Sequence, residues 1–344
     1  MSILDEILGF LHYNPDSARS EIAENLANPP SPSSMKRLLS DAVENGMIAI
    51  DGRGRASRYS ITPKAHLLRT YDVDEYFKKE IDERTVQTSF NFDLLENLLP
   101  KVELFSGDEM RRLDALQRKF TENISKISAD SYNAEMERLG IDLSWKSSQI
   151  EGNTYSLLET ERLLRERKQA DGKSREEAIM LLNHKEALRF LLENPDYLQS
   201  LSVSRIEDVH SILVRDLNVE RNIRRSRVGI TGTNYRPLDN DFQIRKAMEL
   251  ACNLINGRKN VFERSMLSVL LLSYIQPFAD GNKRTSRIVG NAVLIAEKCC
   301  PLSFRSVDSL KYKEAVLVFY EQNNISAFKK IFIDQYDFAV NTYF

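Results

Sequence analysis

The sequence is poor in cysteine and histidine, the residues from which thiol and metal sites are most often built. Of its three cysteines, Cys299 and Cys300 are adjacent and Cys252 is distant, so there is neither a metal pattern nor a disulfide framework. This usage favours a reducing, cytoplasmic setting. The histidines are scattered, at His12, His66, His184 and His210. His210 falls in a helical stretch and is expected to be structural.

Long apolar runs and a large net charge are also missing. No stretch of about 18 or more apolar residues predicts a membrane span, and the N-terminus is not expected to be a signal peptide. The net charge is −2 at pH 7, so the charge of the whole chain does not direct it to nucleic acid or to a membrane. With 344 residues and no internal repeat, the chain can hold two or three compact units.

The most informative stretch is the loop QPFADGNKRTSR at residues 276–287. An apolar run at residues 261–275 precedes it without a clean polar face, which predicts a buried central helix. Pro277 and Gly281 interrupt this run, and a second apolar helix is predicted from about Arg284. The loop would therefore present its backbone amides at the N-terminus of a helix.

The residue types in this loop suit a polyphosphate. Unpaired amides and the dipole at a helix N-terminus favour an anion. Arg284 and Arg287 are three residues apart, so both guanidinium groups can lie on one face of the first turn. Asp280 offers a hard oxygen ligand for a magnesium ion shared with phosphates. The loop therefore predicts a nucleotide site.

These residues resemble the pattern HxFx(D/E)GN(G/K)RxxR of Fic (Fido) domains, most of which transfer AMP from ATP to a protein hydroxyl. The resemblance implies ATP and Mg²⁺ as cofactors and a mainly α fold. The residues implied in binding phosphate are Gly281, Asn282, Lys283, Arg284 and Arg287, with Asp280 as the metal ligand.

Two positions depart from the pattern. Gln276 stands where the family has the histidine that takes the proton from the attacking hydroxyl, which a neutral amide cannot do. A positioned general base is worth about 10²–10⁴-fold in rate. With Gln276 and Arg284 at the catalytic positions, we therefore expect AMP transfer to be weak or absent, although nucleotide binding need not be weakened. Lys283 replaces the usual glycine and also occurs in Doc-type relatives, so phosphate transfer stays open.

A second part of the resemblance is the segment SSQIEGN at residues 147–153, which fits the inhibitory motif (S/T)xxxE(G/N) of the family. Ser147 and Glu151 are four residues apart and would share a helix face, and Gly152 is a natural helix end. In the family the glutamate pairs with the second arginine of the loop, here Arg287. We therefore expect Glu151 to be autoinhibitory; on its own, the motif would be a plain helix cap.

Residues 227–237 alternate β-branched residues with turn formers and predict a short hairpin. The resemblance makes this hairpin a flap that docks a target protein as an added strand, and an ordinary surface hairpin is the alternative. The flap residues are Gly229, Ile230, Thr231, Gly232, Thr233 and Asn234. The arginine cluster Arg221, Arg224, Arg225 and Arg227 is interpreted as a solvated face, with target docking as the alternative. Tyr312 matches the YxxA/L helix that lines the family's adenine pocket, although a lone tyrosine on a helix is more often core.

The first 65 residues predict three helices at 3–11, 17–26 and 33–45, then two strands at 47–50 and 57–61. This order resembles a winged helix-turn-helix. Residues 36–64 carry six basic and three acidic groups, a net of +3 on the third helix and the wing. The candidate DNA-binding residues are Lys36, Arg37, Arg53, Arg55 and Arg58. Winged helices also dock proteins, so both uses stay open.

Together these features predict three regions: a winged helix at 1–65, a linker with short helices at 66–100, and a Fic domain at 101–344 whose inhibitory helix lies near 144–153. The expected function is a Fic-type adenylyltransferase scaffold, weak or inactive because of Gln276 and inhibited by Glu151. The alternatives are a nucleotide-binding pseudoenzyme that regulates transcription and a Doc-like phosphotransferase. The expected partners are a target protein at the flap and DNA at the winged helix, a homodimer is left open, and no membrane is expected.

Overall fold

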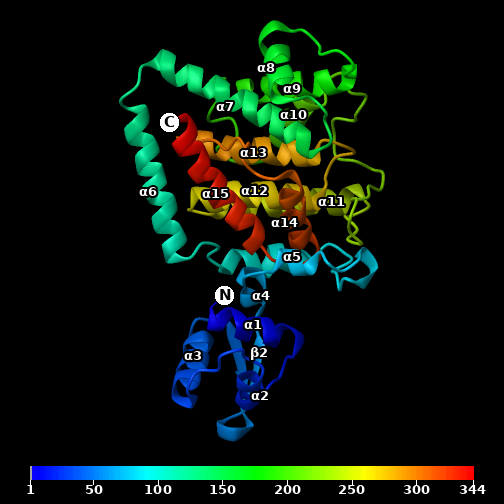
Figure 1. Cartoon of the computed structure of the whole chain (residues 1–344). Helices are drawn as coiled ribbons and strands as arrows, with labels where there is room; N and C mark the ends of the chain where they lie inside the picture. Colours follow the sequence, from blue (N-terminus) through cyan, green and yellow to red (C-terminus); the bar gives the residue numbers. More distant parts are fainter. Residues whose placement is uncertain (1) are drawn as a thin grey trace.

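A computed structural model describes residues 2–344, apart from the side chain of Arg55. The chain is mainly helical, which confirms the predicted fold class. Figure 1 shows a small N-terminal unit below a larger helical body, with α4 (Pro63–Leu68) between them. Within residues 2–344, no helix is long and apolar enough to cross a membrane.

The N-terminal unit contains three helices and an antiparallel strand pair, in the predicted order. The elements are α1 (Ile3–Tyr13), α2 (Arg19–Glu24), α3 (Pro32–Glu44), β1 (Ile48–Asp51) and β2 (Arg58–Ile61), with a short 3₁₀ turn at Gly54–Ala56. The strand register sets Ile48 opposite Ile61 and Asp51 opposite Arg58. Ser17 adds an isolated bridge to Tyr59, through N–H···O bonds of 3.1 and 2.9 Å, and so attaches the start of α2 to the sheet.

Two separate hydrophobic cores meet at α4. Apolar side chains from α1, α3 and β1 form the smaller core, which also includes Ala65. Two residues further along α4, Leu67 belongs to the larger core of the body. Ile325 donates its N–H to the carbonyl of Leu67 at 2.9 Å, and the His66 ring nitrogen lies 2.6 Å from the Gln322 carbonyl. This short helix therefore holds the small unit against the body.

The segment after α4 runs along the body in short pieces. These are α5 (Val73–Tyr76), 3₁₀ turns at Ile81–Glu83 and Leu99–Lys101, and one π-helical turn at Leu94–Leu98. The remaining helices are α6 (Gly107–Ile124), α7 (Ala129–Ile150), α8 (Leu157–Glu166), α9 (Arg175–Glu193), α10 (Val203–Leu213), α11 (Asp241–Gly257), α12 (Val261–Ile275), α13 (Asn282–Ala296), α14 (Ser309–Gln322) and α15 (Ser326–Tyr343).

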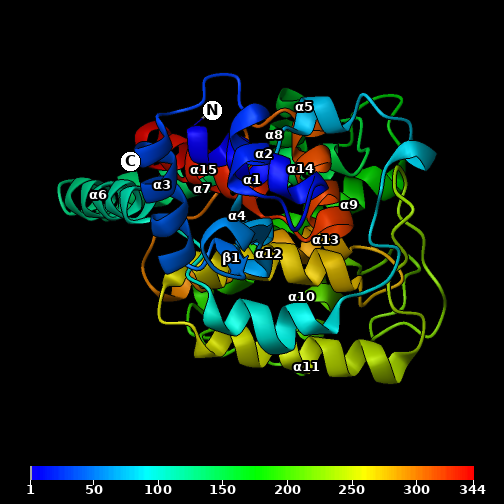
Figure 2. The ribbon, with the colours of Figure 1, turned by 90° about the horizontal axis from the view of Figure 1, so that it is seen from below.

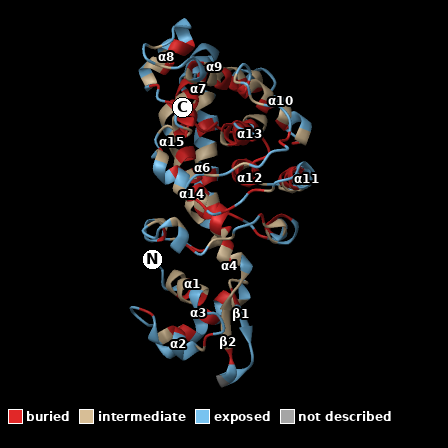
Figure 3. Ribbon diagram, turned by 90° about the vertical axis from the view of Figure 1, so that its right-hand side faces the viewer, coloured by how far each residue is buried: buried red, intermediate tan, exposed pale blue. Residues whose placement is uncertain are grey.

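The centre of the body is the pair α12 and α13, which pack along each other. Figure 3 shows both helices as largely buried, and almost every residue of α12 is inaccessible. Seen from below in Figure 2, α11 runs along one side of this pair, and Figures 1 and 2 both place α6 at the margin, where it packs against α15. The loop between α12 and α13 therefore joins two closely packed, largely buried helices.

Candidate nucleotide-binding site

The loop begins where α12 stops. Gln276 takes the left-handed conformation (φ 52°, ψ 60°) and ends the helix, with its N–H bonded to the Leu272 carbonyl at 3.1 Å. Asn282 braces the loop, because its side chain accepts the Phe278 N–H and donates to the Phe278 carbonyl, both at 2.8 Å. Gly281 (φ 78°) caps α13, whose first backbone bond runs from Thr285 to Gly281 at 2.9 Å. The backbone N–H groups of residues 282–284 therefore have no partner within the helix, as the sequence predicted for a helix N-terminus.

The two arginines of the loop lie on one side of α13 and are almost fully buried, with 2% and 0% exposure for Arg284 and Arg287. Arg284 donates to Asp280 Oδ2 at 3.1 Å. Within the described chain, the Nη1 atom of each arginine is buried without a hydrogen-bond partner. An anion bound beside α13 would give both donors the partner that they lack.

Glu151 occupies part of this place. It caps the C-terminus of α7, and its Oε1 accepts from Arg287 Nη2 at 2.9 Å while its Oε2 lies 3.6 Å from Lys283 Nζ. Ser147, one turn earlier, accepts from Arg287 through its hydroxyl and its carbonyl, each at 2.9 Å. Burial opposes ionisation of Glu151, but Arg287 and Lys283 outweigh it and hold the pKa of this carboxyl below its usual value. The carboxylate is therefore charged and paired.

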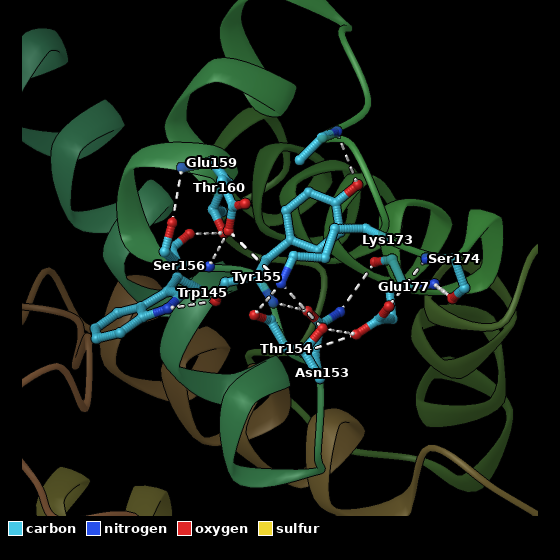
Figure 4. Close-up of polar contacts among 11 residues, drawn as sticks. Trp145, Asn153, Thr154, Tyr155, Ser156, Glu159, Thr160, Lys173, Ser174 and Glu177 are labelled. Carbon is cyan, nitrogen blue, oxygen red and sulfur yellow. Dashed lines mark hydrogen bonds and ion pairs between the residues drawn. The ribbon is translucent and has the colours of Figure 1, made fainter.

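The segment that follows Glu151 is anchored to α9, as Figure 4 shows. Glu177 accepts the N–H and the hydroxyl of Thr154, both at 2.7 Å, and Asn153 Nδ2 donates to the Glu177 carbonyl at 3.0 Å. Trp145, on α7 itself, donates to the Tyr155 carbonyl at 3.0 Å. No sequence pattern points to Glu177, because its bonds reach back 23 residues to Thr154. This network fixes the end of α7 and with it the position of Glu151.

Gln276 is buried, with 7% exposure, and its side-chain amide donates to the Ser273 carbonyl at 2.6 Å. The backbone carbonyl of Gln276 accepts from Arg224 Nε at 2.7 Å. Arg224 was interpreted as part of a solvated arginine face, and this is wrong: its side chain is fully buried. The guanidinium also bonds the carbonyls of Ser226 and Leu238, at 2.6 and 2.5 Å, which gives a buried cation the partners it requires. By contrast, Arg225 and Arg227 are exposed.

Two histidines outside the motif lie close to the loop. The ring of His210 stacks on Phe278, with centroids 3.7 Å apart and an angle of 4° between planes, and its Nδ1 lies 3.2 Å from Thr285 Oγ1. Burial lowers the pKa of His210 to about 4. Burial, together with the charges of Arg287 and Arg284, lowers the pKa of His184 to about 3. Both imidazoles are therefore neutral at pH 7, and their proximity could not be read from sequence spacing.

Tyr312 lies beneath the arginines. The guanidinium carbon of Arg287 is 5.4 Å from the centroid of its ring, and the ring makes edge-to-face contacts with Phe304 and Phe328. At 2% exposure, this tyrosine supports Arg287 from below. Its role in an adenine pocket stays a prediction.

The expected flap hairpin is wrong. Residues 227–237 contain no strand pair in the described structure, and the chain forms only an isolated parallel bridge between Arg236 and Ser89. Figure 1 shows this segment as part of the long loop before α11. Side chains hold the segment in another way: Arg84 donates to the Gly232 carbonyl at 2.6 Å, and Arg224 donates to the carbonyls of Ser226 and Leu238, which flank the segment. Asn234 reaches Asp82 at 3.0 Å. The hairpin is thus replaced by an extended loop that is hydrogen-bonded to Asp82 and Arg84 of the linker.

The site residues that would hold ATP and a metal fit those groups. The open amides of α13 and the two orphan Nη1 atoms are donors for phosphate oxygens. Asp280 is 65% exposed, and no cluster of three or more metal-ligating side chains occurs in the described chain. One carboxylate completed by phosphates and water is the usual arrangement for Mg²⁺.

Comparison with known proteins agrees with this geometry. Residues 200–294 match the model of the Fic/DOC family. These residues are therefore similar to that family. It is 27% identical over 229 residues to the protein adenylyltransferase Fic of Nematostella vectensis, covering 64% of this chain and 52% of that protein, and 27% identical over 258 residues to that of Aedes aegypti, covering 72% and 50%. The chain thus spans about half the length of the curated relatives it matches.

Solved Fic structures share the fold of this domain. A fragment of Fic-1 from C. elegans superposes with a TM-score of 0.60 at 18% identity, covering 69% of this chain and 72% of that one. A Fic-domain signalling protein from Bacteroides thetaiotaomicron gives a TM-score of 0.56 at 19% identity, covering 67% and 96%. At these identities the likeness concerns the fold alone.

Proposed function

We propose that the Fic domain binds ATP with Mg²⁺ and is a scaffold for AMP transfer to a protein hydroxyl, held in an inhibited state by Glu151. The observation that carries the proposal is the pairing of Glu151 with Arg287 beside two buried, unpartnered guanidinium nitrogens. A γ-phosphate bound by Arg287 would compete with the carboxylate for the same cation. The names of the relatives support AMP transfer as the reaction.

In this proposal the chain's own groups bind and orient the nucleotide. Arg284, Arg287 and the first amides of α13 would hold phosphate oxygens, and Asp280 would supply the carboxylate for Mg²⁺, which neutralises phosphate charge. The proton of the attacking hydroxyl has no imidazole to receive it at position 276. The amide of Gln276 donates to Ser273 and is a poor base, so turnover is expected to be slow.

The test measures binding and chemistry separately. ATP with Mg²⁺ is titrated calorimetrically into the wild type, the Glu151→Gly variant and the Gln276→His/Glu151→Gly double variant, and each protein is then incubated with ATP and weighed intact. We expect tighter binding in both variants and added mass of AMP in the double variant. A folded double variant that binds ATP without gaining mass would refute the transferase scaffold.

A Doc-like phosphotransferase is the second candidate, and Lys283 is the residue that favours it. Its ammonium lies 3.6 Å from Glu151 and takes part in the same charge cluster as Arg287. The same mass measurement separates the two reactions, because phosphate and AMP add different increments. A third outcome, binding without any added mass in all proteins, would indicate a nucleotide-sensing pseudoenzyme.

We further propose that the N-terminal unit is a winged helix. The support is the order of three helices and a strand pair, together with the bridge from Ser17 to Tyr59, which adds a third strand position beside the hairpin. The unit has its own core, so it is built as a separate module.

A further inference from the structure

An arginine without a counter-ion lies at the junction between the N-terminal unit and the body. Arg69 caps the C-terminus of α4 and is 8% exposed. Within residues 2–344 it forms no ion pair, and its Nε and Nη2 atoms are buried without a hydrogen-bond partner. Its N–H donates to the Ala65 carbonyl at 2.7 Å, and its carbonyl accepts from Asn324 Nδ2 at 2.9 Å. The backbone therefore fixes this cation at the junction, while its charge has no partner.

Carboxylates of the neighbouring segments are engaged with other groups. Glu321 of α14 lies 3.4 Å from Arg84, and Asp5 of α1 accepts the Ser2 N–H at 3.1 Å. A buried cation without an anion destabilises a protein, because nothing replaces the hydration that it lost on folding. Arg69 is therefore expected to lower the stability of the free protein.

Two imidazoles belong to the same junction. The rings of His12 on α1 and His66 on α4 have centroids 5.0 Å apart, and both side chains are half-buried. His66 bonds the Gln322 carbonyl, whereas His12 forms no side-chain hydrogen bond within the described residues. Burial, with the charges of Arg69 and His66, lowers the pKa of His12 to about 4. Burial and Arg69 also lower the pKa of His66, although its bond to Gln322 opposes this. Both rings therefore lie within the field of the unpaired guanidinium.

Aromatic rings frame the cluster. The guanidinium carbon of Arg69 lies 4.7 Å from the centroid of Tyr71, and a ring in this position covers one face of the guanidinium and leaves its in-plane N–H groups free. Tyr13 contacts His12 edge-on, with centroids 4.6 Å apart, and is 69% exposed. The cluster therefore reaches the surface beside Tyr13.

We infer that Arg69, His12 and His66 form a binding site for a phosphate group, either inorganic phosphate or a phosphomonoester. Nε and Nη2 share one edge of the guanidinium, and this edge is the fork through which arginine bonds two phosphate oxygens at once. A tetrahedral phosphate has further oxygens for the imidazoles, which a planar carboxylate lacks.

The site joins the two parts of the chain. Arg69 is bonded to Asn324 of the body, whereas His12 belongs to α1 of the N-terminal unit, and Figure 1 shows α4 between α1 and the body. A bound phosphate would therefore hold the unit against the body. This inference does not depend on the proposed transferase activity.

The test titrates sodium phosphate calorimetrically into the full chain and follows the unfolding midpoint in parallel. Arg69→Met keeps an apolar stem, and His12→Phe keeps an aromatic ring; each should weaken phosphate binding at least tenfold. The matched control is Lys64→Met, which removes one charge from the same helix and should bind like wild type. Phosphate bound beside α13 is a background common to all four proteins.

Stability separates a ligand site from a structural residue. Without phosphate, Arg69→Met should melt at the same temperature as wild type or higher, because it removes an uncompensated buried charge. Phosphate should raise the midpoint of wild type more than that of Arg69→Met. An Arg69→Met protein that melts well below wild type without phosphate, or equal phosphate affinity of wild type and both site variants, would overturn the inference.

Other anions identify the ligand. Phenyl phosphate that binds more tightly than inorganic phosphate would indicate a monoester, and the reverse order would indicate free phosphate. Sulfate stays a dianion as the pH falls, so its affinity should rise several-fold from about pH 7.5 to pH 5.5, because the bound anion raises the pKa values of His12 and His66 and binding takes up protons. Acetate that binds as tightly as phosphate, a sulfate affinity that does not change with pH, or equal loss in Lys64→Met would each overturn the inference.

Discussion

Removing the charge of Glu151 should tighten ATP binding, and the structure allows the size of the effect to be worked out. Glu151 lies 2.9 Å from Arg287 and 3.6 Å from Lys283. At an effective dielectric constant of about 20, a charge pair at 2.9 Å interacts by about 6 kcal/mol before desolvation is subtracted. Measured coupling energies for close charge pairs run from about 1.5 to 7 kcal/mol.

The nucleotide has to displace this carboxylate to reach Arg287, so the coupling opposes binding. Even the low end of that range, about 1.5 kcal/mol, corresponds to about tenfold in the dissociation constant. We therefore expect Glu151→Gln to bind ATP with Mg²⁺ at least tenfold more tightly than wild type. Glu151→Gly also removes the side chain from the phosphate position, so it should bind at least as tightly as Glu151→Gln.

Calorimetry at pH 7.5 is the assay, and Glu161→Gln is the matched control. Glu161 forms an exposed pair with Arg165 at 3.1 Å on α8, and such surface pairs contribute little. The apo form of Glu151→Gln should also melt at a lower temperature than wild type, because Arg287 loses its buried counter-ion. ATP should restore the midpoint. Equal ATP affinity of wild type and both Glu151 variants, all folded, would refute the competition between carboxylate and phosphate.

Three further predictions follow from single contacts. Gly281→Ala should abolish measurable ATP binding, because at φ 78° the added Cβ would lie 3.2 Å from atoms of His210 and Val214. The control, Gly46→Ala (φ 67°, no atom within 4 Å), should lose only about 1–2 kcal/mol of folding free energy to left-handed backbone strain. Equal ATP affinity of the two variants would contradict this prediction. Arg224→Lys should lower the free energy of unfolding by about 2–3 kcal/mol in urea titration, because lysine cannot bond three carbonyls in a plane, whereas Arg225→Lys should stay within about 0.5 kcal/mol. Burial opposes ionisation of Glu177, but its bonds from Thr154 and Ser174 lower its pKa to about 2 from 4.5, so its stabilising contribution is present above pH 4.5 and is lost toward pH 2; Glu177→Gln should therefore lose less thermal stability than wild type between pH 5 and pH 3, and parallel curves would exclude the carboxylate as the source.

The sequence predicted those parts of the fold that local signals determine. The apolar run at residues 261–275 became α12 with the same bounds, because almost the whole run is buried and Gln276 and Pro277 end it. The predicted second helix begins at Asn282, one residue after Gly281, the position at which glycine supplies the left-handed cap. Spacing also predicted that Ser147 and Glu151 share a face, and both bond Arg287.

Contacts between distant segments could not be predicted in this way. The segment at residues 227–237 has the composition of a hairpin, yet it forms no strand ladder: Arg84 bonds the carbonyl of Gly232, and Arg224 bonds the carbonyls of the two flanking residues. Arg224 stands among arginines that are exposed, and only the tertiary structure shows that it is buried beneath Gln276 and Leu238. A charged residue in a polar run gives no sign of burial, because the partners that make burial tolerable come from other parts of the chain.

The geometry of Gln276 separates binding from chemistry in this domain. Three hydrogen bonds hold its left-handed backbone. The Gln276 N–H donates to the Leu272 carbonyl, Arg224 Nε donates to the backbone carbonyl of Gln276, and the Arg224 backbone N–H donates to the carbonyl of Pro277. None of these bonds involves the side chain of residue 276. We therefore expect the loop to keep its shape whichever side chain stands at position 276, so that a substitution there changes only the group offered as a proton acceptor. Under the proposed function, such a site would bind nucleotide without an imidazole at position 276, and the Glu151 carboxylate would control binding even if transfer is slow.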